Sequence, residues 1–231
     1  MMLWTFGWPY RSGGNNVSMS ATRLATRARA SGPRALDLTI LALGAPLWVP
    51  TLALVATVIR IVDGPPIFFR QLRAGVDAVP FSILKFRTMV PEADSLLDEH
   101  GRPTVARNTR TGRGLRRFGL DELPQLVNVL QGQMSLVGPR PVLPEWVDKI
   151  PGGSFHPRFR VPPGLTGPAQ VAGRNLVPWS HRIRLDAEYA RSRSVSTNLR
   201  WLVLTPAALL QPTVSADRNA EDVDDLEPGH G

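Results

Sequence analysis

An uncharged apolar stretch, residues 38–59, constrains the fold of this chain more than any other feature. As a helix it is long enough to span the roughly 30 Å hydrocarbon core of a bilayer. Pro46 and Pro50 lie inside it, and each proline removes a backbone donor and clashes with the preceding turn. Three interpretations follow: a helix that bends at proline and leaves the bilayer on the face it entered, a full span, or a buried core helix.

The charges that flank this stretch favour the first interpretation. Arginines lie on both sides of it, at Arg29 and Arg34 before it and at Arg60, Arg70 and Arg73 after it. Because lysine and arginine concentrate on the cytoplasmic side of a membrane, two basic flanks give no preferred direction of crossing. A re-entrant helix, whose two ends lie on the same side, accounts for both the prolines and the flanks.

Two adjacent carboxylates, Asp121 and Glu122, are the strongest candidates for chemistry. They follow three arginines, Arg113, Arg116 and Arg117, whose guanidinium groups can hold phosphate. Neighbouring acids can bind Mg²⁺, and one of them could attack phosphorus as a nucleophile. By itself, an Asp-Glu pair would more often be only a helix cap beside a solvated basic loop.

The residues after the acid pair predict a helix. Apolar side chains recur at the i, i+3, i+4, i+7 spacing of one helix face, at Leu123, Leu126, Val127 and Leu130. Asp121 would be the N-cap of this helix, and Pro124 would fall in its first turn. Both carboxylates would then lie at the positive end of the helix dipole, where anions are stabilised.

Cations elsewhere in the chain could also contact phosphate. Arg140 lies between two prolines, which restrict the backbone around it and suit an anion contact. Lys85 and Arg87 would share one face of a strand over residues 80–88, by its period of two, and could form a diphosphate clamp. As a lone motif, Lys-x-Arg would more often be a solvated strand face.

Four ordered blocks of sequence strongly resemble the bacterial sugar transferases, the monotopic phosphoglycosyl transferases. They are Lys-Phe-Arg-Thr-Met (85–89), Leu-Asp-Glu-Leu-Pro-Gln (120–125), Met-Ser-Leu-Val-Gly-Pro-Arg-Pro (134–141) and Pro-Gly-Leu-Thr-Gly (163–167) with Gln170, Gly173 and Arg174. The resemblance runs from about residue 34 to about residue 205, which is nearly the whole chain.

The resemblance implies transfer of a sugar 1-phosphate from a nucleoside diphosphate sugar, expected to be a UDP-sugar, to polyprenyl (undecaprenyl) phosphate. This is the initiating step of exopolysaccharide, capsule, O-antigen or glycoprotein glycan synthesis. Asp121 would form a covalent intermediate, and Glu122 would help to hold Mg²⁺ or position the acceptor phosphate, with both as metal ligands. Six basic residues are the implied phosphate contacts: Lys85, Arg87, Arg116, Arg117, Arg140 and Arg174.

The resemblance also implies a place in the cell and a shape for the membrane helix. The enzyme would lie at the inner (plasma) membrane with its catalytic domain on the cytoplasmic face, and Pro50 would be the kink proline. The family usually has serine before that proline, where this chain has Val49. Any hydroxyl hydrogen bond that shapes the bend in relatives is therefore missing here.

The expected fold class is α+β, with the re-entrant helix, a small catalytic domain of mixed helices and short strands, and interfacial amphipathic helices. The expected parts are a basic, poorly ordered N-terminal segment (1–33), the membrane helix (34–62), the catalytic domain (63–212) and an acidic disordered tail (213–231). Residues 198–210 suit a helix in the membrane interface, with a core helix as the alternative. Residues 169–171 are expected to form a strand.

Composition narrows the choice of partner. A net charge of +8 and a pI of about 11.2 favour anionic partners. A nucleic-acid-binding module would explain the charge, but not the acid pair or the apolar helix, so no nucleic acid is expected. The absence of cysteine excludes disulfides and thiolate metal sites. A conventional membrane-associated glycosyltransferase and a non-catalytic membrane scaffold remain alternatives, and a homo-oligomer is compatible with the sequence.

Overall fold

The computed structural model of the chain describes residues 31–91, 93, 107–173 and 177–210. The chain divides into two units, Met1–Ser31 and Gly32–Gly231, and the contacts given below lie within the second. The predicted acidic tail and almost all of the predicted basic N-terminal segment lie outside the described residues.

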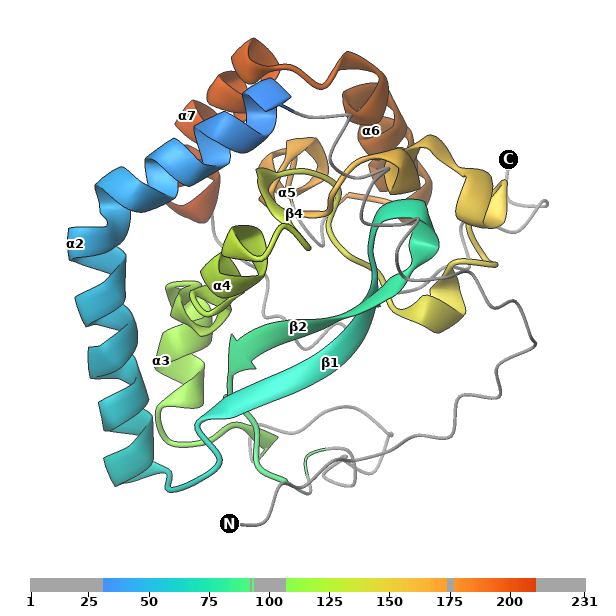
Figure 1. Ribbon diagram of the computed structural model, residues 1–231. Coiled ribbons are helices and arrows are strands. Elements are labelled where there is room, and N and C mark those ends of the chain that lie inside the picture. The colour runs from blue at the N-terminus through green and yellow to red at the C-terminus, as the bar shows by residue number, and fades with distance from the viewer. Residues whose placement is uncertain (1–30, 92, 94–106, 174–176, 211–231) are drawn as a thin grey trace. The chain divides into compact units, whose positions relative to one another are not determined.

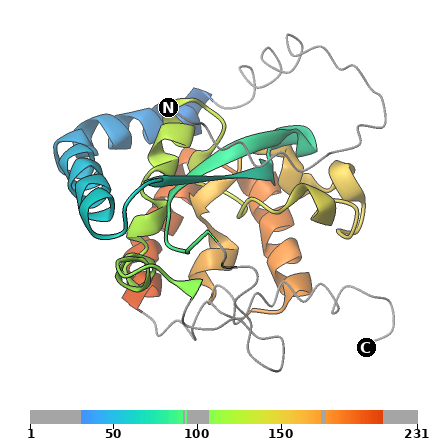
Figure 2. The same cartoon turned by 90° about the horizontal axis from the view of Figure 1, so that it is seen from below.

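The apolar stretch forms the long helix α2, Ser31–Val62, with Pro46 and Pro50 inside it. The helix changes direction partway along its length (Figure 1 and Figure 2), as helices do where proline interrupts the backbone ladder. Trp48 lies between the two prolines, and its Nε1 donates a hydrogen bond of 2.9 Å to the carbonyl oxygen of Leu41. The helix is therefore bent, whereas its re-entry into a bilayer stays a prediction.

Most of the surface of α2 is apolar and exposed. The segment Gly32–Val62 is long and apolar enough to cross a membrane. Its most apolar 18 residues have a mean hydropathy of 2.0, and only 11% of them are buried. Leu43, Leu47 and Ile61 are among its exposed side chains. A core helix would be mostly buried, and water solvates such a surface poorly, so α2 favours membrane association over the core alternative.

Both halves of α2 contact the rest of the domain. In the first half, buried Asp37 accepts hydrogen bonds from Ser135 Oγ (2.7 Å) and from the backbone N–H of Leu136 (3.1 Å). In the second half, Ile59 belongs to a core cluster that includes Phe86. Helix α2 is thus joined to the elements that carry the acid pair and its partners.

Strand β1, Phe68–Ala74, and strand β2, Pro80–Phe86, form an antiparallel ribbon joined by the 3-10 turn η1, Val76–Ala78. The predicted strand over residues 80–88 is present, but it ends two residues earlier than expected. Its register pairs Lys85 with a phenylalanine of β1.

The acid pair lies in a 3-10 turn. This turn, η4, Leu120–Glu122, precedes helix α4, Gln125–Leu130, and the N-cap of α4 is Pro124. The prediction that Asp121 is the N-cap is therefore wrong. Pro124 has no N–H to donate to the preceding turn. Gly119, the N-cap of η4, has a φ of 67°, in the left-handed region that glycine adopts readily. A tight turn therefore precedes the α-helix.

The buried face of α4 also differs in part from the predicted one. Its buried residues are Gln125, Leu126, Asn128 and Val129. Leu130, which the apolar spacing placed on the buried face, is exposed. Asn128 instead faces β2, where it accepts from the N–H of Leu84 (3.0 Å) and donates to the carbonyl oxygen of Ser82 (2.8 Å). A buried amide can replace an apolar side chain there because the strand satisfies it.

Two blocks of the family resemblance meet as parallel strands, β3, Ser135–Val137, and β4, Gly164–Thr166. Their backbones approach closely at glycines. A Cβ on Gly164 would lie 2.0 Å from the backbone nitrogen of Gly138, and one on Gly138 would lie 2.4 Å from the carbonyl oxygen of Pro162. No side chain fits at such distances, so both glycines are required to place the Pro139–Pro141 loop.

The second half of the domain is mainly helical. Helix α5, Pro168–Val171, replaces the strand expected at residues 169–171, so that prediction is wrong. Its first residue is a proline, whose fixed φ suits the first position of a helix. The remaining helices are α6, Trp179–Ser192, and α7, Val195–Leu210. Three 3-10 turns precede them: η5, Pro144–Trp146, η6, Gly153–Phe155, and η7, Pro157–Arg160.

A buried tyrosine links the last two helices to the strands. Tyr189 Oη of α6 lies 2.8 Å from the carbonyl oxygen of Val137 and 2.8 Å from Asn198 Oδ1 of α7. On α7, Val203 and Leu199 are exposed, so the helix combines a buried polar contact with an exposed apolar side. Its location in a membrane interface stays a prediction. The α+β fold class, with small sheets and one candidate membrane helix, is confirmed.

Candidate active site

Glu122 lies among cations that two other elements bring to it. Its Oε1 atom lies 2.9 Å from Lys85 Nζ, on β2, and 2.9 Å from Arg140 Nη2, in the loop after β3. The side chains of Lys85, Glu122 and Arg140 are 19%, 23% and 53% exposed, so the group is open to solvent. We call Lys85, Asp121, Glu122 and Arg140 the open cluster.

The two carboxyls of the open cluster have pKa values shifted in opposite directions. Burial alone would raise the pKa of Glu122, but the charges and hydrogen bonds of Arg140 and Lys85 outweigh it and hold that pKa well below its ordinary range. Burial raises the pKa of Asp121, and the adjacent Glu122 charge raises it further; Lys85, Arg116 and Arg140 offset these effects only in part. Glu122 is therefore the carboxyl of the pair that is more strongly held in its ionised form.

Asp121 differs from Glu122 in its contacts as well. Among the residues that the structure describes, none donates a hydrogen bond to the Asp121 carboxylate or forms an ion pair with it, although three cations act on it electrostatically. No direct contact with these residues therefore competes with a ligand for its oxygens. The arrangement can bring an anion close to a nucleophilic oxygen, because Lys85 and Arg140 neutralise Glu122 and Arg116 adds a further positive charge.

Arg116 belongs to helix α3, Gly112–Arg117, directly before the acid pair. Its Nε donates to Thr88 Oγ1 (3.1 Å) and its Nη1 to Asn108 Oδ1 (3.4 Å). The guanidinium is held beside the open cluster by these neutral groups, and no acid among the described residues forms an ion pair with it. The neighbouring Arg117 is exposed, with its Cζ 5.9 Å from the ring centroid of Phe118.

Arg87 lies apart from the clamp that the sequence suggested. It is buried and donates to three consecutive carbonyl oxygens in the turn just after α2, those of Asp63, Gly64 and Pro65, at 2.7 to 2.9 Å. Because β2 ends at Phe86, the alternation that would place Arg87 beside Lys85 does not extend to it. A phosphate contact by Arg87 stays a prediction. Arg174 lies outside the described residues, and Pro50 lies within α2.

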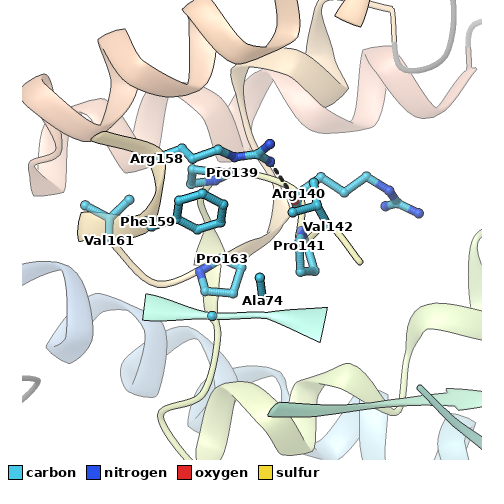
Figure 3. A pocket seen from close by; sticks show the side chains of 10 residues that line it. Ala74, Pro139, Arg140, Pro141, Val142, Arg158, Phe159, Val161 and Pro163 are labelled. Carbon is cyan, nitrogen blue, oxygen red and sulfur yellow. Dashed lines mark hydrogen bonds between the residues drawn. The ribbon is translucent and has the colours of Figure 1, made fainter. Parts of the chain in front are cut away.

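A second arginine–carboxylate pair contacts the backbone of the Arg140 loop, and no sequence motif pointed to it. Arg158 Nη2, on η7, lies 3.1 Å from Asp186 Oδ2, on α6, and both side chains are 2% exposed. The same nitrogen donates a 2.7 Å hydrogen bond to the carbonyl oxygen of Arg140 (Figure 3). We call Arg158 and Asp186 the buried pair. No spacing signal could have found it, because its members lie on separate elements.

Comparison with known proteins identifies the family. The sequence model of the family described as "Bacterial sugar transferase" matches residues 28–212, which include the open cluster and the buried pair. The chain belongs to this family. The resemblance drawn from the four sequence blocks is thereby confirmed, and so is the expectation of an enzyme of the phosphoglycosyl transferase kind.

Several similar proteins align with most of this chain. The uncharacterized sugar transferase EpsL of Bacillus subtilis is 43% identical over 156 residues, which are 66% of this chain and 74% of the relative. The UDP-glucose:undecaprenyl-phosphate glucose-1-phosphate transferase of Caulobacter vibrioides is 39% identical over 77% of this chain and 69% of the relative. The undecaprenyl-phosphate glucose phosphotransferase of Komagataeibacter xylinus is 37% identical over 86% of this chain, but over only 40% of the relative.

The two adjacent acids of this sugar transferase are oxygen donors of the kind that Mg²⁺ prefers. The described residues contain no group of three or more histidine, cysteine or acidic side chains that could enclose a metal ion. Mg²⁺ commonly uses one or two carboxylates and completes its shell with water and substrate phosphates. Asp121 offers oxygens that form no ion pair with a described residue, and Glu122 offers oxygens that Lys85 and Arg140 already contact. The donor set therefore suits Mg²⁺ bound together with a diphosphate.

Proposed function

We propose that this sugar transferase moves a sugar 1-phosphate from a UDP-sugar to polyprenyl phosphate, with Asp121 as the nucleophile. The observation that carries the proposal is the division between the two adjacent carboxylates. Glu122 is neutralised by Lys85 and Arg140, whereas Asp121 has no partner among the described residues and lies within the field of three cations. The printed names of relatives, which act on UDP-glucose and undecaprenyl phosphate, support the choice of substrates.

The proposed reaction has two displacements at one phosphorus. An Asp121 carboxylate oxygen attacks the β-phosphorus of the UDP-sugar, and the bond to the bridging oxygen breaks, so that UMP leaves with the electron pair. The aspartyl phospho-sugar is then attacked by an oxygen of polyprenyl phosphate. This second step forms polyprenyl diphosphate sugar and restores the carboxylate, so that the protein is unchanged over the cycle.

The cations reduce the electrostatic repulsion that arises when anionic substrates are brought together beside a carboxylate. Two unit charges at about 4 Å repel by roughly 4 kcal/mol at an effective dielectric of 20. In the open cluster, Lys85 and Arg140 cancel the charge of Glu122, and Arg116 adds a charge that has no ion-pair partner among the described residues. Bound Mg²⁺, with Asp121 and Glu122 as its protein ligands, would stabilise the charge that develops on the phosphate oxygens.

The membrane helix gives this site access to a lipid acceptor. We infer that α2 enters and leaves the inner membrane on the cytoplasmic side, because it is bent, apolar and flanked by arginines on both sides. Single cysteines near Arg34 and near Arg73 should then react with a membrane-impermeant thiol reagent only from the cytoplasmic side. Labelling of either position from the outside would mean that α2 spans the membrane.

The released nucleotide tests the proposed function. Purified enzyme in detergent is supplied with Mg²⁺, polyprenyl phosphate and, in turn, a panel of UDP-sugars and other nucleotide sugars. Release of a nucleoside monophosphate with one donor, together with a lipid diphosphate sugar, supports a phosphoglycosyl transfer. Release of a nucleoside diphosphate would identify a conventional glycosyltransferase, and no release with any donor would favour a non-catalytic scaffold. An Asp121→Asn preparation is the matched control.

A further inference from the structure

We propose that Arg158, held by Asp186, is a positioning residue that fixes Arg140 through its backbone and so sets the geometry of the open cluster. This inference rests on the proposed function, since it assigns Arg158 an effect on the chemistry at Asp121 without any contact to substrate.

The buried pair holds one side chain in one place. Arg158 Nη2 has two hydrogens and two acceptors, Asp186 Oδ2 at 3.1 Å and the carbonyl oxygen of Arg140 at 2.7 Å. The Arg158 guanidinium carbon also lies 5.5 Å from the ring centroid of Phe159 and 5.6 Å from that of Trp179. Rings on the guanidinium and a carboxylate at its edge leave little freedom of movement.

The loop that carries Arg140 is held through its carbonyl oxygens. The prolines on either side have no N–H, so hydrogen bonds to the carbonyls must place this backbone. The carbonyl oxygen of Pro139 accepts from Gly164 (2.9 Å) and that of Val142 from Ala74 (2.9 Å), both through backbone N–H groups. The carbonyl oxygen of Arg140 itself accepts from Arg158. Arg158 thus supplies the charged donor at the residue whose side chain reaches Glu122.

Stability alone does not account for the buried pair. Within the described part of the chain, Arg158 Nη1 and Asp186 Oδ1 have no hydrogen-bond partner. An incompletely satisfied ion pair in the interior is often no more stable than well-packed apolar residues of similar volume. The atoms of the pair that are satisfied are those that connect α6 to the Arg140 carbonyl, which is the arrangement that a positioning role requires.

The consequence reaches the acid pair through Arg140. Its Nη2 atom lies 2.9 Å from Glu122 Oε1, so a shift of the loop moves a cation relative to both carboxylates. A displacement of about 1 Å in such a site can cost up to roughly 100-fold in rate. Loss of Arg158 should therefore lower kcat, while a variant that already lacks the Arg140 side chain should be insensitive to it.

A double-mutant cycle tests this dependence. The buried pair is replaced by apolar residues of similar size, Arg158→Met with Asp186→Leu, in the wild type and in Arg140→Ala, and initial rates of nucleotide release are measured. We expect the apolar pair to keep the melting temperature but to lower kcat by about 10- to 100-fold in the wild type. In Arg140→Ala the same change should lower kcat less than about twofold. Arg160→Met, an exposed arginine on the same turn, is the control and should change neither quantity.

The apolar pair and Arg140→Ala each lower kcat by some factor. If these two factors multiply in the combined variant, the proposal is overturned, because Arg158 then acts independently of Arg140. If the apolar pair does not fold, Arg158→Lys replaces it in the same cycle. Lysine keeps the charge beside Asp186, but its single ammonium cannot reproduce the planar geometry at the Arg140 carbonyl. The rates in this cycle are measured from whichever nucleotide the wild type releases. Release of UDP in place of UMP would therefore refute the proposed reaction and still decide whether Arg158 acts through Arg140.

Discussion

The open cluster and the buried pair both join arginine to a carboxylate, and they meet at Arg140. The side chain of Arg140, 53% exposed, reaches Glu122 in the open cluster, while its carbonyl oxygen is held by Arg158 in the buried pair, where both side chains are 2% exposed. An exposed pair can exchange a partner for a phosphate, but a buried pair cannot do so without leaving a charge uncompensated. The open cluster is therefore suited to the substrate contact proposed above, and the buried pair to the proposed positioning role.

The pKa shifts of the two regions follow from the same difference. Two cations beside Glu122 hold its pKa well below the ordinary range despite burial. Asp186 is buried more completely beside Arg158, with Arg182 as a weaker influence, and burial raises its pKa to about 6. Solvent access and the number of cations in direct contact, two at Glu122 and one at Asp186, thus decide whether a carboxyl is held ionised.

The largest expected effect separates Asp121 from Glu122. Asp121→Asn should lower turnover by about 10⁴-fold, because it removes the attacking oxygen and with it the covalent route. Its melting temperature should change by less than about 3 °C, since no described residue bonds the carboxylate. Glu122→Gln keeps the nucleophile but loses the anion that holds Lys85 and Arg140, so about 100-fold is expected. Initial rates of UMP release would show a wrong assignment if Glu122→Gln were the more damaging change.

Arg140→Lys should have a smaller effect on the open cluster. The charge is kept, but the planar fork that places Nη2 and Nη1 at 2.9 and 3.5 Å from Glu122 oxygens is lost. We expect turnover to fall by about 10-fold, measured with the donor that the wild type prefers. Arg184→Lys, an exposed arginine on α6, is the matched control. Near-normal turnover in Arg140→Lys would show that a point charge suffices at this position.

The smallest expected effect tests the buried pair through pH. The raised pKa of Asp186, about 6 against the ordinary 3.8, means that the folded state holds this proton more tightly than the unfolded state. Its contribution to stability is fully present below pH 3.8 and is lost as pH rises through about 6. Relative to Asp186→Asn, the wild type should therefore lose at most about 3 kcal/mol of stability over that range. Melting temperatures of both proteins at pH 4 and pH 7 measure this; a constant difference would mean that Asp186 has an ordinary pKa.

Much of the open cluster could be predicted from the sequence, because its members lie in short motifs with fixed neighbours. The structure brings Lys85, Glu122 and Arg140 into contact, although the roles of these residues stay proposals. The partners of Arg87 could not be predicted, since they depend on where β2 ends and on a loop that closes back from α2. The N-cap prediction for Asp121 failed because Pro124 divides the expected helix.

The buried pair and the buried face of α4 could not be predicted for a different reason. Arg158 and Asp186 come together only when η7 packs against α6, and a periodic pattern within one element carries no information about that contact. Asn128 reads as polar in the sequence, yet it is buried because the backbone of β2 satisfies its amide. The α+β class and the long apolar helix were predicted correctly, since local pattern and length determine them.

The central claim is that Asp121, and not Glu122, becomes covalently attached to the sugar phosphate. The most direct measurement incubates the wild type with Mg²⁺ and a UDP-sugar labelled at the β-phosphate, without polyprenyl phosphate, and maps the modified peptide by mass spectrometry. We predict a phospho-sugar adduct on Asp121, formed together with one equivalent of UMP and discharged when polyprenyl phosphate is added. An adduct on Glu122 would reverse the assignment, and the absence of any adduct, with kinetics that require both substrates before UMP leaves, would contradict the covalent route.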